Sequence, residues 1–582
     1  MKRRQFLGAG LSLAAAATLD VRVAAAASRV RPGDAGWPSD SDWAGLSDAV
    51  GGRLSKVTLT DLSDPSVAKQ LTNPFFIGDQ VGLTESSGWL DAWRSAPSAY
   101  AVTAQSAADI AAAVRFASAH NLRLVIKGRG HSYLGGSNAP DSLLVWTRHM
   151  DDVTVHDAFT PQGAAGPAVP AVSCGAGAMW LHAYEAVTGG AGRYVQGGGC
   201  TTVGVAGLVQ GGGFGSFSKA YGAGAASLIE AEIVTADGRV RVVNATQEPD
   251  LFWALKGGGG GTFGVVTRLT LATHELPQTF GAVQGAFKAN SDQAFRRLLT
   301  RFVEVYATKL FNPHFGETVQ ATPDNGLRIS MVFQGLTQDE ARAAFQPLAD
   351  FVAANPADYA TPQPLQALAV PARLFWNASV LGAVPGAIVK DGRPDAAPGD
   401  FWWATNTEEA GIFWHAYQSA WLPERLLAPG QRERLADAWF AASRHWETTF
   451  HFNKGLAGAP PEAIAASRDT AMNPDVLTAF ALVIIGAGGP SLFTHEPDVA
   501  TGHAHAARVA DAMREVRAVA PDTGAYVNEC DYFQPDWQRA FWGPHYQRLL
   551  AVKRRYDPTG LFTVHHGVGS EGWSTDGFTR SA

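Results

Sequence analysis

Cysteine is scarce in this chain: three residues occur among 582, namely Cys174, Cys200 and Cys530. A scaffold built on disulfides needs a dense and even set of cysteines, so that class of protein is excluded. No pair of cysteines has the spacing of zinc ligands, and we expect no metal site. The odd number instead raises the question of which cysteine has a chemical task.

A basic stripe and long apolar runs are also missing. The net charge is −7, and lysine and arginine gather on no segment, so nucleic acid is not expected as a partner. After the first 27 residues, no segment offers the roughly 20 consecutive apolar residues that a membrane span needs. We therefore expect a small-molecule substrate as the partner, and the sequence leaves the oligomeric state open.

The first residues have the features of an export signal. Arg3 and Arg4 precede a Phe-Leu pair and a short Ala/Leu stretch, and small residues lead up to Ser28. This pattern predicts a twin-arginine signal peptide over residues 1–27, which would carry a folded protein to the periplasm or out of the cell. The alternative is a disordered tail that happens to begin with two arginines.

Glycine is abundant: 63 residues follow no repeat period, which excludes collagen-like and solenoid folds. We expect an irregular lead-in at 28–93. Residues 94–275 combine a helix with a capping box at Ser106 and Asp109, buried strands, a hairpin turn at Asp237-Gly238 and glycine loops, which indicates an α+β or α/β domain. From 276 to 519, amphipathic helices alternate with strand-like runs, and we interpret this stretch as an inserted second domain. Residues 520–582, with a helix expected from Trp542 to Tyr556, then complete the first domain.

Three glycine-rich loops next to predicted strands carry the chemical signal of the first domain. They lie at residues 127–136, 196–215 and 257–264. Backbone N–H groups can hold the pyrophosphate of a nucleotide, and glycine lets the chain come that close. Gly259 to Gly264 matches G-x-G-x-x-G, but it leads into a strand where a Rossmann loop would open a helix. One such loop would be an ordinary flexible connection, whereas three together indicate a nucleotide site.

Two of these loops carry a nucleophilic side chain. His131 follows Gly130, and Cys200 follows three glycines. A lone loop histidine is usually a surface residue, and a free cysteine is usually a small buried hydrophobe. The glycines before Cys200, however, favour an exposed loop in which a thiolate could react.

The spacing of these motifs resembles a known family. Lys127-Gly-Arg-Gly-His131-Ser, followed by Gly-Gly-Gly-Cys200-Thr-Thr-Val-Gly, is similar to the paired signature of the berberine bridge enzyme-like flavoproteins, within the vanillyl-alcohol oxidase/PCMH superfamily. Residues 250–267 resemble the family's next loop, and Tyr526-Val-Asn528 resembles part of its C-terminal segment. The resemblance implies an α+β fold: a two-lobed PCMH-type FAD-binding domain with an inserted substrate domain built on an antiparallel sheet with helices.

The resemblance also implies a covalently bound cofactor. In the family the histidine bonds the 8α-methyl group of the flavin and the cysteine bonds C6, so His131 and Cys200 are expected to hold FAD in this way. Imidazole and thiolate are nucleophiles that can add to the electron-poor flavin ring. The other residues expected to bind FAD are Lys127, Gly128, Arg129, Gly130, Ser132, Gly199, Thr201, Thr202, Gly204, Gly207, Gly212, Gly213, Gly215, Gly259, Gly260, Gly264, Val265, Val266 and Asn528.

Two catalytic roles come from the same resemblance. Val203 matches the residue that gates oxygen access, where valine goes with oxidase behaviour; a core valine is the alternative. Tyr526 matches the catalytic base of the family's sugar and alcohol oxidases. Tyrosine titrates near pKa ~10, so a base role needs a lowered pKa, to which Asn528 or Lys127 could contribute. A buried, hydrogen-bonded tyrosine is an equally good interpretation.

The substrate domain is less informative. Trp414, His415 and Gln418 are candidate substrate contacts, although aromatic residues in a predicted sheet more often belong to a core. The adjacent His565 and His566 could reach the active site, but capping a helix end is the favoured interpretation. Cys530 could be inert or pair with Cys174.

The resulting hypothesis is an FAD-dependent oxidase that acts on an alcohol or carbohydrate hydroxyl and reduces O2 to H2O2. One alternative is a dehydrogenase or oxidative tailoring enzyme acting on a phenolic or polyketide-like compound. The alternative from another class is a non-catalytic flavin-containing binding protein.

Overall fold

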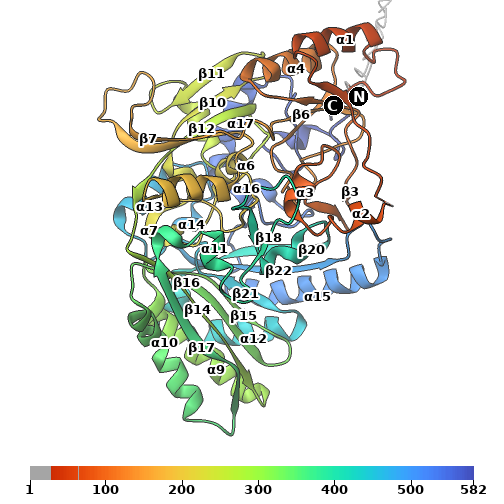
Figure 1. The fold of residues 1–582 in the computed structure, drawn as a ribbon. Helices are drawn as coiled ribbons and strands as arrows, with labels where there is room; N and C mark the ends of the chain where they lie inside the picture. The colour runs from red at the N-terminus through yellow and green to blue at the C-terminus, as the bar shows by residue number, and fades with distance from the viewer. Residues whose placement is uncertain (1–27, 63, 582) are drawn as a thin grey trace, which may run out of the picture.

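The computed structural model describes residues 28–62 and 64–581, so the predicted signal peptide lies outside the described residues. Figure 1 shows small sheets near both chain ends and, at the opposite end of the molecule, a large sheet covered by helices. Ser28 forms a β-bridge with Thr579, which places the two ends of the described chain side by side.

A four-stranded sheet with the order β1-β4-β6-β5 forms the part nearest the N-terminus. Strands β4, β5 and β6 run parallel, as is usual where helices cover a sheet. Ser106 caps the covering helix α4 and Asp109 completes the capping box, as the sequence predicted. The elements are α1 (Asp40–Ala49), β1 (Leu54–Lys56), β4 (Tyr100–Thr103), α4 (Ala107–Ala119), β5 (Arg123–Lys127) and β6 (Ser142–Trp146).

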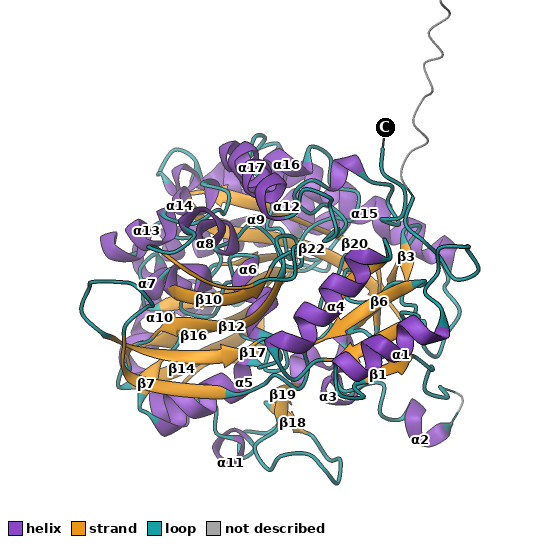
Figure 2. Cartoon of the chain, turned by 90° about the horizontal axis from the view of Figure 1, so that it is seen from above, coloured by secondary structure: helices purple, strands orange, loops and turns teal. Residues whose placement is uncertain are grey.

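A five-stranded antiparallel sheet with the order β11-β10-β12-β8-β7 lies beside it (Figure 2). Strands β10 and β11 form the hairpin that Asp237-Gly238 predicted, with Gly238 at φ 70°. The elements are β7 (Val153–Phe159), β8 (Val169–Gly175), α5 (Trp180–Tyr184), α6 (Val205–Gln210), β10 (Leu228–Val234), β11 (Val240–Asn244), α8 (Pro249–Leu255) and β12 (Val265–Ala272).

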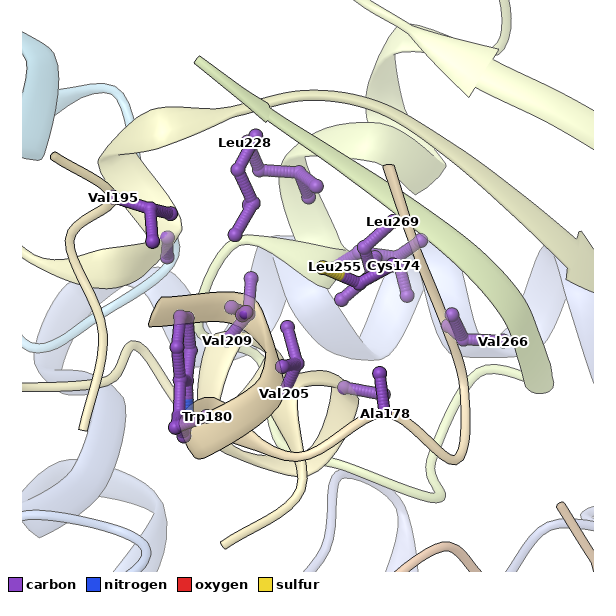
Figure 3. Packing of buried hydrophobic residues seen from close by; sticks show 14 of the residues in the cluster. Cys174, Ala178, Trp180, Val195, Val205, Val209, Leu228, Leu255, Val266 and Leu269 are labelled. Carbon is purple, nitrogen blue, oxygen red and sulfur yellow. The ribbon is translucent and has the colours of Figure 1, made fainter. Parts of the chain in front are cut away.

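The core between this sheet and its helices is built from side chains that are distant in sequence. Trp180 of α5 and Val205 and Val209 of α6 are fully buried, and Figure 3 shows them beside Leu269 of β12. Burying side chains of this size contributes about 1.5–3 kcal/mol each. Helix α6, Val205–Gln210, is thereby fixed within the glycine-rich segment 196–215.

The large sheet has nine strands in the order β17-β14-β16-β15-β21-β22-β20-β2-β3 and is antiparallel except for the β2–β20 pair. Helices α9, α10, α12 and α15 cover one face (Figure 1). The elements are β2 (Ser86–Trp89), β3 (Trp93–Arg94), β14 (Thr279–Ala289), α9 (Asp292–Val305), β15 (Phe315–Ala321), β16 (Gly326–Gln334), α10 (Gln338–Ala353), β17 (Tyr359–Pro371), β20 (Ile412–Pro423), α12 (Arg432–His445), β21 (Thr448–His451), β22 (Ala479–Gly489) and α15 (Val499–Arg517).

Short elements connect these layers. They are α2 (Pro65–Ala68), α3 (Pro74–Gly78), β9 (Arg193–Tyr194), α7 (Ser218–Tyr221), β13 (His274–Glu275), α11 (Ala378–Leu381), β18 (Ile388–Lys390), β19 (Phe401–Trp403), α13 (Pro461–Arg468), α14 (Asp475–Thr478), α16 (Trp537–Trp542) and α17 (Tyr546–Tyr556). Within the described part of the chain, no helix combines the length and the apolar character required to cross a bilayer.

Two local expectations differ from the structure. The segment 28–93, expected to be irregular, contains α1 and the strands β1, β2 and β3, and β2 and β3 extend the large sheet. The helix expected from Trp542 to Tyr556 is divided into α16 and α17 because Gly543 has φ 52° and Pro544 follows it. The first difference arises because strand pairing orders a segment whose own periodicity is weak. The second arises because turn residues interrupt the helix.

A close backbone contact gives a prediction for stability. A Cβ atom added to Gly215 would lie 1.6 Å from the carbonyl oxygen of Gly197. We expect Gly215→Ala to lower the free energy of unfolding by about 3 kcal/mol, because backbone cannot yield as a side chain can. Thermal unfolding measures this, with Gly189→Ala as the control, since no atom lies within 4 Å of its added Cβ. Equal melting temperatures for the two variants would contradict the contact.

Candidate active site

A single large cavity of about 1560 Å³ lies between the glycine loops, the uncovered face of the large sheet and the C-terminal segment. It receives side chains or backbone from most of the predicted site residues. Those that line it are Gly128, Arg129, Gly130, His131, Ser132, Gly199, Cys200, Val203, Gly204, Gly207, Gly259, Gly260, Gly264, Val266, Trp414, Tyr526 and Asn528. Those that do not line it are Lys127, Thr201, Thr202, Gly212, Gly213, Gly215, Val265, His415 and Gln418.

Lys127 ends β5 and faces away from the cavity. Its ammonium group donates to the carbonyl oxygens of Gln80, Val81 and Leu83 at 3.2, 2.6 and 3.0 Å. Burial lowers the pKa of Lys127 to about 7, and the three carbonyls satisfy its donors. The ammonium group of Lys127 is therefore directed away from Tyr526 and from the cavity, and it fixes the segment before β2 against the glycine loop.

Arg129 has the opposite character. Its side chain is 3% exposed and lines the cavity, and none of its three guanidinium nitrogens has a hydrogen-bond partner among the described residues. Asp79 approaches Nη1 only to 3.8 Å. A buried guanidinium with free donors is suited to a phosphate or another anionic group.

The glycine loops offer backbone surface next to this cation. A Cβ atom added to Gly207 would meet nothing within 4 Å, so the chain leaves open space there. The buried polar atoms of Asn138 and the Oε1 atom of Gln210 line the same cavity without partners in the described part of the chain. An elongated, polar, phosphate-bearing group such as FAD fits this arrangement of free donors, free acceptors and open backbone.

His131 is partly buried at the cavity wall, and its Nε2 atom lies 3.3 Å from Oγ1 of Thr202. Burial, with the cation of Arg129, lowers the pKa of His131 to about 3. The imidazole is consequently neutral at physiological pH, which is the nucleophilic form. Thr202 does not line the cavity; it orients the ring of His131.

Cys200 lies in the same cavity, but its thiol is not activated. Burial, followed by the carboxyl group of Glu409, raises its pKa well above the ordinary value, and Lys454 opposes this shift. The expectation of a thiolate favoured by an exposed loop therefore needs correction, because the side chain is only partly exposed and lies among carboxyl groups.

The other two cysteines are also free. Cys174 is buried in the core of the five-stranded sheet (Figure 3), and Cys530 is buried with its thiol 3.3 Å from the carbonyl oxygen of Val527. The possible pairing of Cys530 with Cys174 is therefore not formed, and both behave as small apolar side chains.

Tyr526 is buried, and its hydroxyl oxygen accepts hydrogen bonds from the backbone N–H of Gly213 at 3.1 Å and from Nδ2 of Asn528 at 3.0 Å. Burial raises the pKa of Tyr526, while these two donors lower it. These two N–H donors stabilise the deprotonated, negatively charged form of the Tyr526 hydroxyl group. Gly213, which does not line the cavity, thus acts on this hydroxyl group.

The three candidate substrate residues all lie on strand β20, but only one of them faces the cavity. Trp414 lines the cavity and donates from Nε1 to Ser86 at 3.0 Å. His415 faces α15, with Nδ1 3.1 Å from Nδ1 of His505, and Gln418 donates to Asp531 at 2.8 Å. A bulge between Trp414 and Ala416 shifts the alternation of the strand, so that Tyr417 faces the cavity instead. The expected contacts of His415 and Gln418 with substrate are therefore corrected.

Four charged side chains at the Cys200 end of the cavity were missed by the sequence reasoning. Glu317, Glu409, Glu529 and Lys454 all line the cavity, and all four influence the pKa of Cys200. The two that are most distant in the sequence, Glu317 and Glu529, lie more than 200 residues apart, and no sequence motif includes all four. Only the antiparallel pairing of β15 with β21 brings Glu317 near Lys454.

The two adjacent histidines of the C-terminal segment line the cavity and cap no helix. The ring of His565 stacks on Tyr532 at 3.7 Å and on His566 at 3.9 Å. Val564 beside them lies 3.2 Å from the Cβ position of Gly261, so this segment contacts the third glycine loop directly. The favoured interpretation as a helix cap is therefore wrong.

Comparison with known proteins agrees with this site. Residues 98–244 match the family model described as FAD binding domain, and residues 525–569 match berberine and berberine like. An uncharacterized FAD-linked oxidoreductase of Arthroderma benhamiae is 31% identical, over 95% of this chain and 96% of its own.

Solved structures share the fold. The VAO-type flavoprotein MtVAO615 from Myceliophthora thermophila C1 is 26% identical with a TM-score of 0.77, covering 95% of this chain and all of its own (100%). A glucooligosaccharide oxidase from Acremonium strictum, described with a 6-S-cysteinyl, 8α-N1-histidyl FAD, is 18% identical with a TM-score of 0.64, covering 90% of this chain and 99% of its own. The latter likeness concerns the fold alone.

The predicted α+β, PCMH-type fold and the predicted family are thus confirmed, and the cavity provides the donors and the open backbone that FAD requires. The chain belongs to the berberine bridge enzyme-like FAD-linked oxidoreductases of the vanillyl-alcohol oxidase group.

Proposed function

We propose that this FAD-linked oxidoreductase is an exported oxidase that holds its flavin through His131 and Cys200 and oxidises an alcohol or carbohydrate hydroxyl, with O2 reduced to H2O2. The observation that supports it most is that His131, Cys200 and Tyr526 line one cavity although they lie up to 395 positions apart in the sequence. The histidyl and cysteinyl linkage described for the glucooligosaccharide oxidase supports the same assignment.

Bound FAD would accept hydride from the substrate carbon and return the electrons to O2. The residues of the chain prepare this chemistry. The neutral imidazole of His131 is available for bonding without deprotonation, since its pKa lies at about 3. Cys200 must lose a proton before it can bond, and Lys454 is the cation that favours this loss.

Tyr526 would accept the proton of the substrate hydroxyl. Burial opposes the charged form of Tyr526, and the donors from Gly213 and Asn528 offset part of that cost. Because a general base acts in its deprotonated form, the phenolate of Tyr526 is the active species, and the two donors increase its population. Asn528, predicted to bind FAD, is in this proposal the residue that orients the base.

Export is part of the proposal and rests on the sequence alone. The twin-arginine signal over residues 1–27 would deliver a protein that has already acquired its cofactor. Two covalent bonds would then prevent loss of FAD in the periplasm or outside the cell.

A dehydrogenase or tailoring activity on a phenolic or polyketide-like compound is the second candidate, favoured by the aromatic residues Tyr133, Trp414 and Tyr417 on the cavity wall. Oxygen consumption during turnover separates this candidate from an oxidase. A non-catalytic binding protein would retain an oxidised flavin in the presence of every compound tested.

Acid precipitation tests the two bonds. We expect flavin absorbance to stay with the precipitated wild-type protein and with each of His131→Ala and Cys200→Ala, because one covalent bond suffices to hold the cofactor. The double variant should release flavin into the supernatant. Free flavin from the wild-type protein would contradict the covalent assignment.

Substitution of Tyr526 tests the base. Tyr526→Phe should lower kcat/KM by about 10²–10⁴ while the flavin spectrum is retained, since only the proton acceptor is removed. In the wild type kcat/KM should rise with pH, because burial raises the pKa of Tyr526 and the phenolate is the active form. Asn528→Ala removes a donor that stabilises the phenolate and should move this rise to higher pH. A flat pH profile in all three proteins would exclude Tyr526 as the base.

Val203 lines the cavity three residues after Cys200 and tests oxygen access. We expect Val203→Leu to slow reoxidation of the reduced enzyme by O2, because the longer side chain fills the space beside the flavin, while reduction by substrate continues. Stopped-flow measurement of the two half-reactions separates these effects. An unchanged reoxidation rate would leave Val203 as an ordinary wall residue.

A further inference from the structure

The Cys200 end of the cavity carries more carboxyl groups than cationic side chains. Glu529 and Lys454 form an ion pair at 2.5 Å and neutralise each other. Glu317 and Glu409 remain, and neither forms an ion pair with any residue that the structure describes. Two carboxyl groups without a cationic partner therefore face the space next to Cys200.

Glu317 is held in position by a strained backbone. It lies within strand β15 but has φ 67°, a left-handed conformation that costs a non-glycine residue about 1–3 kcal/mol. Its Oε1 atom accepts hydrogen bonds from Ser216 at 2.6 Å and Asn453 at 3.3 Å. No described residue bonds Oε2, so one carboxyl oxygen stays free on the cavity side. The strain is retained where it aims a charged group at the cavity.

Asn453 provides an independent sign of a ligand. Its side chain is 2% exposed and lines the cavity, and its Oδ1 atom has no hydrogen-bond partner among the described residues. Its Nδ2 atom is directed by the carbonyl oxygen of Gly215 and by Glu317, each at 3.3 Å. A buried amide oxygen without a donor is costly, and a ligand that donates hydrogen bonds would remove that cost. Oε2 of Glu317 and Oδ1 of Asn453 are both acceptors.

Glu409 adds a second charge to the same region. Its hydrogen-bond partner is Asn406 at 3.2 Å, and burial raises its pKa to about 7. A bound cation would favour the ionised form, so ligand binding and ionisation of Glu409 are linked. The titratable groups that face the two carboxyls are Glu85, Tyr133, Tyr184, Tyr194, Cys200, Tyr417, Lys454 and Glu529.

Aromatic rings complete this part of the wall. Tyr133 lies 4.9 Å from Trp414 and 5.3 Å from Tyr417 between ring centroids, and Trp414 lies 4.9 Å from Tyr417. All three line the cavity. Ring faces attract cations and also accept the apolar carbons that surround an amine.

We propose that the substrate carries an ammonium group, bound by the free oxygens of Glu317 and Asn453, with Glu409 supplying the second negative charge and the aromatic wall the apolar contact. The substrate class is thus an amino alcohol or amino sugar. The inference rests on the proposed oxidase function. A neutral polyol would satisfy the two acceptors but would leave the negative charge of the pocket without compensation.

Matched ligand pairs test the proposal. The flavin spectrum of the anaerobic holoenzyme is titrated with tyramine against tyrosol, and with the β-1,4-linked glucosamine trimer against cellotriose. We expect the ammonium compound of at least one pair to bind at least tenfold more tightly than its neutral partner. Equal or tighter binding of the neutral compound in both pairs, or no spectral response to either amine, overturns the proposal.

Substitutions of Glu317 test whether this residue causes the preference for the ammonium compound over its neutral partner. Glu317→Gln should abolish the preference for the ammonium compound, and the exposed Glu462→Gln is the matched control that retains it. Glu317→Gly should also abolish the preference without lowering the melting temperature, because glycine adopts φ 67° without strain. A merely structural Glu317 would give the reverse: lower melting temperatures with the preference unchanged.

The pH dependence has a defined sign. Affinity for tyramine, whose alkyl amine stays protonated in this range as a lysine does, should increase as pH rises through about 7 because Glu409 must ionise, whereas affinity for tyrosol should not. If amines bind preferentially but no compound bleaches the flavin, the oxidase function fails and the ammonium site stands. If neutral alcohols bleach it and amines have no advantage, the oxidase stands and the ammonium site is overturned.

Discussion

The short segment Gly211–Ser216 is the crossing point on which the site depends, because four close contacts meet there. Gly215 packs backbone to backbone on Gly197, in the run that leads to Cys200. The N–H of Gly213 bonds the hydroxyl of Tyr526, and Ser216 bonds Glu317. A Cβ atom on Gly316 would lie 2.0 Å from the carbonyl oxygen of Ser216, so strand β15 of the large sheet also presses on this segment. The segment before Cys200, the hydroxyl group of Tyr526 and the carboxyl group of Glu317 are thereby fixed relative to one another.

The buried charged side chains of this protein form two groups. One group is fully hydrogen-bonded within the fold, and the other lines the cavity. Lys127 and Lys219 are buried with three carbonyl acceptors each, so their charge is satisfied by the fold. Arg129 and Glu317 line the cavity and keep free donor or acceptor atoms there. Groups of the first kind stabilise the fold, while groups of the second kind are complete only with a ligand. We propose a cofactor phosphate as the complement of Arg129 and a substrate cation as the complement of Glu317.

Local sequence signals predicted the elements of the fold well. Residues whose position depends on contacts between distant segments could not be predicted. The capping box at Ser106, the Asp237-Gly238 hairpin and the glycine loops are encoded within a few residues, and the structure has each of them. The family motifs located the flavin cavity. His415 could not be distinguished from Tyr417 because a β-bulge reverses the alternation of the strand. Glu317 could not be predicted as a site residue from the sequence. A left-handed residue inside a strand has no recognisable sequence pattern, and the partners of Glu317 lie on distant segments.

The central claim is that one flavin joins two distant loops, and peptide mass spectrometry tests it most directly. Trypsin should cut the denatured protein into the peptides 130–148 and 194–219, which contain His131 and Cys200. The account predicts a single species that contains both peptides and one flavin. Recovery of both peptides separately, each without added mass, would contradict it.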